Sequence, residues 1–139
     1  MFWKRTVARG LCILEAGLLT TLALLEYLSG YRAGVMRHLY FFKIEYMDSL
    51  YSSSILPLHA TALLLGFVCI VRVSSSMYQR DRHLFRWYYG ALVTAFFLCR
   101  FLPAIQTLTV AAHLLIAIEC IAGLEILRAL LIRSTSRTP

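Results

Sequence analysis

Four long apolar segments dominate the pattern of hydrophobic and polar positions along the chain. They cover residues 11–30, 55–73, 84–102 and 104–127. A helix rises about 1.5 Å per residue and needs about 20 mostly apolar residues to cross the hydrocarbon core of a bilayer, so each segment is long enough to span a membrane. Pro103 separates the third segment from the fourth, because proline lacks a backbone N–H and disfavours helix just before it. The pattern predicts an all-α integral membrane protein with four transmembrane helices in a single domain, residues 1–139.

The connector between the first two apolar segments, residues 31–54, has a pattern of its own. Apolar residues recur there every three or four positions, which places them on one side of a helix: Val35, Leu39, Phe42, Tyr46 and Leu50. We therefore expect a short amphipathic helix that lies at the outer membrane interface or packs over the helical bundle.

Aromatic residues are too numerous in this connector for all of them to face one shallow interface. A surface that docks a partner protein is the second interpretation, since exposed apolar patches mark such sites. The candidate docking residues are Tyr40, Phe41, Phe42 and Tyr46.

Composition supports the membrane as the solvent. Hydrophobic residues make up 60% of the chain and charged residues 15%, whereas the apolar share of a soluble domain is about half. The net charge of +7 would suit nucleic acid, but the basic residues cluster beside the apolar segments and form no aromatic-interleaved stripe. The distribution of the basic residues therefore argues against a nucleic-acid-binding domain.

The distribution of lysine and arginine predicts the orientation. Three basic residues, Arg32, Arg37 and Lys43, lie on one side of the predicted spans. The other side carries Lys4, Arg5, Arg9, Arg72, Arg80, Arg82, Arg86, Arg128, Arg133 and Arg137. Because basic flanks are retained in the cytoplasm, both termini are expected there. The membrane is expected to be the plasma membrane or an endomembrane, with the mitochondrial inner membrane as an alternative.

The four cysteines, Cys12, Cys69, Cys99 and Cys120, each lie within an apolar segment. This placement is typical of small buried side chains and argues against an ectodomain held by disulfides. No cysteine and histidine spacing of a zinc site occurs. We therefore expect no metal and no cofactor.

Four of the seven acidic residues lie within the predicted spans: Glu15, Glu26, Glu119 and Glu125. A charge at the centre of a spanning helix costs roughly 2.5 to 3.5 kcal/mol on insertion scales, so each requires a partner or a role. Counting depth from the predicted helix ends places one acid, one arginine and two histidines in the same outer third. The sequence predicts a polar layer of Glu26, His59, Arg100 and His113, with Glu26 and Arg100 as an ion pair.

The other intramembrane acids have separate interpretations. Glu15 falls on the same helix face as Glu26, so that face is expected to point away from lipid. Glu119 has Gly123 one turn along, where another helix could approach. Glu15 and Glu119 are candidate proton carriers or partner contacts. Glu125 and Arg128 are predicted to form a surface pair near the inner boundary.

Small residues on the third span allow close helix contact. Gly90, Ala91, Thr94 and Ala95 form overlapping pairs four positions apart. We therefore expect the helix of residues 84–102 to be the central one in the bundle.

These features favour a non-catalytic accessory or assembly subunit of a larger membrane protein complex, which packs against other membrane subunits through its intramembrane charges and its aromatic connector. The alternative is a small proton-coupled transporter or channel that acts as a homo-oligomer. An enzyme with membrane-embedded acid and base groups is a third possibility, but no nucleophile or metal motif accompanies those groups.

Overall fold

The computed structural model describes residues 2–75 and 79–136, and in those ranges every long element is a helix. The chain forms α1 (Phe2–Ser29), α2 (Ala33–Ser49), α3 (Leu56–Ser74), α4 (Gln79–Phe101), α5 (Pro103–Gln106) and α6 (Ala111–Ser136). The all-helical prediction is confirmed, and the four apolar segments correspond to α1, α3, α4 and α6.

The start of the fourth apolar segment does not coincide with the start of a long helix. Pro103 does break the helix, but it also begins the one-turn helix α5, where its fixed φ suits a first helical position. The long helix α6 begins only at Ala111 instead of residue 104. The start of this helix is therefore displaced by roughly 10 Å along its axis at about 1.5 Å per residue.

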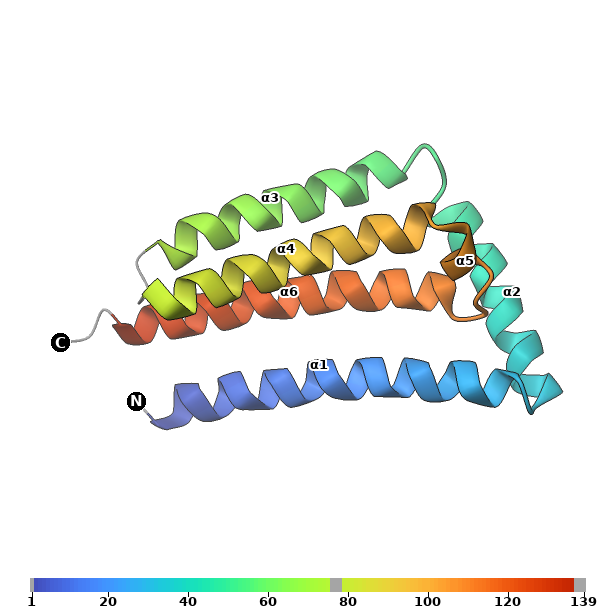
Figure 1. Cartoon of the computed structure of the whole chain (residues 1–139), viewed down its shortest axis with the longest axis horizontal. Coiled ribbons are helices and arrows are strands. Elements are labelled where there is room, and N and C mark those ends of the chain that lie inside the picture. Colours follow the sequence, from blue (N-terminus) through green and yellow to red (C-terminus); the bar gives the residue numbers. More distant parts are fainter. Residues whose placement is uncertain (1, 76–78, 137–139) are drawn as a thin grey trace.

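The long helix α6 is the centre of the bundle, in place of the predicted α4. It contacts α1, α2, α3 and α4, and Figure 1 shows it between α1 on one side and the α3–α4 pair on the other. Small residues let several neighbours approach it, since Ala112, Ala117, Ala122 and Ala129 are all buried.

The first helix, α1, touches the rest of the molecule along a narrow seam. Among its described side chains only Glu15, Leu22 and Ser29 are buried, and they recur at the seven-residue spacing of a helix-packing seam. The remaining apolar side chains of α1 are mostly exposed, so this helix leaves a wide apolar surface uncovered.

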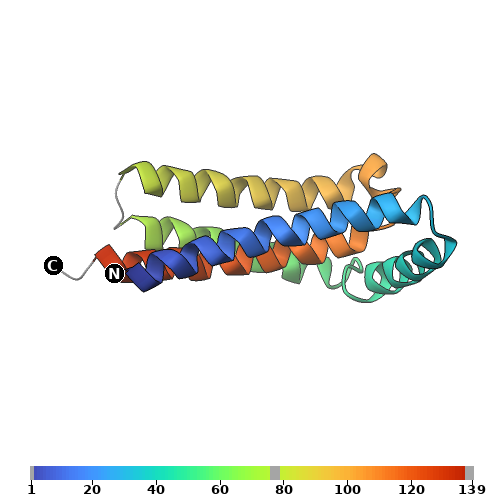
Figure 2. The same cartoon turned by 90° about the horizontal axis from the view of Figure 1, so that it is seen from below.

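The connector helix α2 crosses one end of the bundle, as both views show (Figures 1 and 2). It packs on α1 and α6 with Leu39 buried, while the Lys43 ammonium donates a hydrogen bond to the carbonyl oxygen of Gln106 in α5. The predicted helix in the connector is therefore present. Leu50 is an exception to its predicted apolar face, because this side chain is exposed.

The start of α1, the end of α3, the start of α4 and the end of α6 lie together at the opposite end of the bundle (Figures 1 and 2). Two helical segments in the described ranges, Arg9–Ser29 and Leu56–Ser74, are long and apolar enough to cross a membrane. By length and composition alone this is weak evidence for membrane association, because a soluble core helix or an N-terminal signal sequence has the same properties.

Candidate functional site

The carboxylate of Glu26 forms hydrogen bonds with residues at the start of α6, and Arg100 is not its partner. Its Oε2 accepts hydrogen bonds from the Thr109 hydroxyl at 2.6 Å and from the Val110 backbone N–H at 3.0 Å. The first N–H groups of a helix lack partners within the helix and carry partial positive charge. A carboxylate from α1 therefore caps α6, and the predicted ion pair with Arg100 is absent.

Arg100 is half-buried near the end of α4 and forms no salt bridge with any residue that the structure describes. Its guanidinium carbon lies 5.9 Å from the ring centroid of Phe101, and its Nε is buried without a hydrogen-bond partner. Its backbone carbonyl accepts a hydrogen bond from the Gln106 side chain. The cation–π contact stabilises the charge only in part.

His59 and Glu119 form a polar contact between α3 and α6. His59 Nδ1 lies 2.7 Å from Glu119 Oε1, although the two atoms are not aligned as a hydrogen bond. The contact is an ion pair when His59 is protonated. Glu119, predicted as a proton carrier or partner contact, thus has a partner within its own chain.

Tyr51 lies beside this pair at the end of the connector. Its ring centroid is 5.0 Å from that of His59, and the side chain is almost completely buried. Burial raises the pKa of the Tyr51 phenol, and the negative charge of Glu119 raises it further. The phenol therefore stays neutral at physiological pH.

His113 contacts the connector helix. Its ring lies 5.5 Å from that of Tyr46 in α2, and its Nδ1 is buried without a hydrogen-bond partner. The four residues of the predicted polar layer thus make separate contacts. Glu26 caps α6, His59 meets Glu119, and His113 faces Tyr46, while Arg100 has no carboxylate partner among the residues that the structure describes.

A second polar cluster lies deeper between α1, α4 and α6. Glu15 is 3% exposed and Glu125 is 1% exposed. The Tyr88 hydroxyl donates a hydrogen bond of 3.3 Å to Glu15 Oε2, and Arg128 Nη1 lies 3.0 Å from Glu125 Oε2. The Glu125–Arg128 contact was predicted at the surface, but its carboxylate is among the most buried groups in the described chain.

The charges of this cluster do not balance. Among the described residues, Arg128 forms an ion pair with Glu125 but no ion pair is found for Glu15, whose Oε1 is buried there without a hydrogen-bond partner. Burying an unpaired charge is costly, which favours binding of a proton or another cation. Among the described residues no group of three or more His, Cys, Asp or Glu could hold a metal ion.

Two contacts between helices were not predicted from the sequence. Arg86 of α4 donates hydrogen bonds to the Ser74 hydroxyl at 3.1 Å and to the Val71 carbonyl at 3.2 Å. These bonds give two acceptor groups in the last turn of α3 a partner. Tyr89 of α4 packs directly on Gly66 of α3, where an added Cβ would lie 2.0 Å from the Tyr89 hydroxyl oxygen. A glycine in an apolar segment was the available signal for the second contact.

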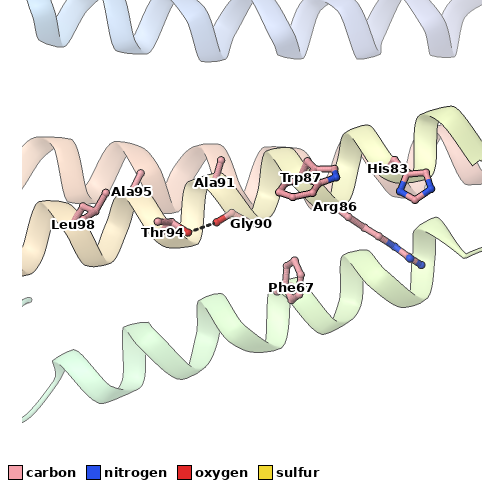
Figure 3. Close-up of a pocket in the computed structure, with 9 residues that line it drawn as sticks. All are labelled: Phe67, His83, Arg86, Trp87, Gly90, Ala91, Thr94, Ala95 and Leu98. Carbon is pink, nitrogen blue, oxygen red and sulfur yellow. Dashed lines mark hydrogen bonds between the residues drawn. The ribbon is translucent and has the colours of Figure 1, made fainter.

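The small residues of α4 face open space. They line a groove of 630 Å³ along α4 and α3, shown in Figure 3. Its lining residues are Phe67, His83, Arg86, Trp87, Gly90, Ala91, Thr94, Ala95 and Leu98. Gly123 on α6 is also uncovered, since a Cβ placed there would meet nothing within 4 Å.

The four predicted docking residues of α2 divide between two faces. Phe42 and Tyr46 are half-buried against the bundle, whereas Tyr40 and Phe41 are exposed. Met36 and Ile44 are exposed as well, and their spacing places them on the same side of the helix as Tyr40. We call Met36, Tyr40, Phe41 and Ile44 the outward face of α2.

Comparison of the chain with protein-family models, with curated proteins and with solved structures finds no match.

Proposed function

We propose that this chain is a non-catalytic accessory or assembly subunit of a larger membrane protein complex. In this proposal α1, α3, α4 and α6 cross the bilayer, both termini are cytoplasmic, and α2 lies at the outer surface. The observation that carries the proposal is the outward face of α2. Lipid would cover the apolar surface of α1, but α2 crosses the end of the bundle, where acyl chains would cover it less completely.

The outward face has the composition of a protein contact. Phe41 is 65% exposed and Tyr40 is 53% exposed. Large aromatic side chains dominate the energetics of protein interfaces. A membrane subunit that presents them next to its bundle gains stability when a partner covers them.

Two matched double variants test whether the exposed aromatic side chains of α2 bind a partner. Tyr40→Ser with Phe41→Ser removes the outward aromatics, and Tyr27→Ser with Tyr31→Ser removes a second exposed aromatic pair outside α2. In mild detergent the wild-type chain and the Tyr27/Tyr31 variant should migrate with a much larger partner on a native gel. The Tyr40/Phe41 variant should migrate alone. A wild-type chain that migrates only as a homo-oligomer would contradict the accessory role.

The second candidate function, a small proton-coupled transporter or channel, is favoured by the Glu15 and Glu125 cluster. Two almost fully buried carboxylates, of which only Glu125 is paired with an arginine in the described chain, are typical of intramembrane proton sites. In reconstituted vesicles a transporter should acidify the lumen when a pH gradient is imposed, and Glu15→Gln should abolish that flux. Vesicles as tight to protons as protein-free ones would exclude this function.

A further inference from the structure

The groove along α4 changes in chemistry from one end to the other. His83, Arg86 and Trp87 line it near the α3–α4 connection, and Gly90, Ala91, Thr94, Ala95 and Leu98 line the rest. Figure 3 shows Arg86 reaching toward α3 at that end, while Phe67 is the lining residue that α3 contributes. The groove thus has a basic end and a long apolar part.

We propose that this groove binds one anionic phospholipid, with the phosphate at Arg86 and His83 and one acyl chain along the small residues of α4. The inference rests on the proposed placement of α4 across the bilayer. Basic pockets between membrane helices on the cytoplasmic side are suited to anionic headgroups.

The length of the apolar part matches a single leaflet. From Trp87 to Leu98 the helix rises about 16 Å at 1.5 Å per residue, and one leaflet of a hydrocarbon core of about 30 Å is about 15 Å deep. Trp87 is 79% exposed, as an amphipathic ring at the headgroup level would be. An acyl chain that begins at Trp87 therefore ends where the groove ends.

Arg86 has donors left for a phosphate. A guanidinium has five N–H donors, and the contacts with Ser74 and Val71 use its Nε and Nη2 groups. The same contacts fix the position of the guanidinium, so little conformational entropy is lost when an anion binds.

A second copy of the chain fits this groove less well than a lipid does. A parallel copy would bring its own His83 and Arg86 to the basic end, and like charges there oppose association. An anionic headgroup is complementary to that end instead.

The headgroup contact is tested by native mass spectrometry of the full chain in mild detergent. Phosphatidylglycerol and phosphatidylcholine with identical acyl chains are added in equal amounts. The wild-type chain should retain phosphatidylglycerol preferentially. Arg86→Gln should reduce that preference about fivefold, since one arginine near a lipid surface contributes about 1 kcal/mol. Arg72→Gln removes the same charge from an exposed position outside the groove and should leave the preference unchanged.

The acyl-chain contact has its own pair of variants. Ala91→Phe fills the apolar part of the groove from an exposed position and should lower retention of both lipids, whereas Ala62→Phe adds the same ring to an exposed site on α3 outside the groove. Circular dichroism checks that each variant is folded. If Arg86→Gln does not fold, His83→Gln, at an exposed position, takes its place.

Several results would overturn the lipid site. Equal retention of the two lipids by the wild-type chain is one, and an Arg72→Gln effect as large as that of Arg86→Gln is another. Unchanged lipid retention in Ala91→Phe, with a change from dimer to monomer, would assign the groove to a second copy. A chain that does not insert into vesicles would refute the proposed function, whereas a chain that inserts without lipid preference refutes this inference alone.

Discussion

At the scale of single residues, the contact between Gly66 and Tyr89 depends on a glycine. Of the glycines in the described chain, Gly66 has the closest neighbouring side chain. Tyr89 is buried, and its hydroxyl occupies the place where a Cβ on Gly66 would stand. Gly90 on α4 provides the comparison, since a Cβ there would lie 3.8 Å from the Phe67 ring in ordinary contact. Gly66 therefore cannot take a larger side chain while Tyr89 stays in place, whereas Gly90 can.

Gly66→Ala should destabilise the protein by about 1 to 3 kcal/mol, the usual cost of overpacking a filled core. Gly90→Ala should be neutral or slightly stabilising, because alanine restricts the unfolded chain and meets no obstacle. Unfolding in detergent, followed by circular dichroism, measures both. Equal stabilities of the two variants would show that Tyr89 does not occupy the site described.

The positions of the polar residues could be predicted from the sequence, but their partners could not. Hydropathy identified the acids inside the apolar segments, and the side of α1 that faces the bundle carries both Glu15, which is buried, and Glu26, which binds the start of α6. It did not identify their partners, because a partner depends on the rotation and depth of the neighbouring helix. The late start of α6 displaced the predicted depths on it by roughly 10 Å. His59 therefore meets Glu119, whereas depth counting placed it beside His113.

At the scale of elements, α6 depends on a cap that another helix supplies. The Glu26 carboxylate accepts hydrogen bonds from the Thr109 hydroxyl, the Thr109 N–H and the Val110 N–H. Thr109 also contacts the Ser29 hydroxyl at 3.0 Å. The end of α1 and the start of α6 therefore form one hydrogen-bonded unit.

Glu26→Ala should lower the free energy of unfolding by about 2 kcal/mol or more, since hydrogen bonds to a charged group contribute about 1.5 to 3 kcal/mol each and the loss leaves helix donors unpaired. Glu26→Gln keeps an acceptor oxygen and should fall between this variant and the wild type. Glu45→Ala removes an exposed acid from α2 as a control. If chemical unfolding gives the same free energy for Glu26→Ala and Glu45→Ala, the Glu26 carboxylate does not cap α6.

Element positions were more predictable than element contacts. The amphipathic period of residues 31–54 was sufficient to place α2, because apolar side chains at helical spacing indicate a face directly. The long helix α6 has buried residues on several sides, so its sequence shows no single apolar face from which its neighbours could be inferred. Its central position in the bundle therefore emerges only from the packed structure.

At the scale of the whole molecule, the arrangement follows from one helix that four others contact. The ends of α1 and α6 near the two termini lie together, and α2 closes the opposite end (Figure 1). Two carboxylates, Glu15 and Glu125, are buried inside the bundle, and many large apolar side chains of the described residues are exposed on its outside. This is the reverse of a soluble surface, where large apolar patches are uncommon.

The central proposal is that the four long helices cross the bilayer, with α2 on one side and the end of α3 and start of α4 on the other. It is tested by labelling single cysteines with a membrane-impermeant maleimide on intact cells, in a chain whose own four cysteines are replaced by alanine. Ser53→Cys, beside α3 at the α2 end, should react from outside, and Ser75→Cys, at the other end of α3, should react only after permeabilisation. Labelling of both positions from the same side, or recovery of the chain in the soluble fraction, would contradict the account.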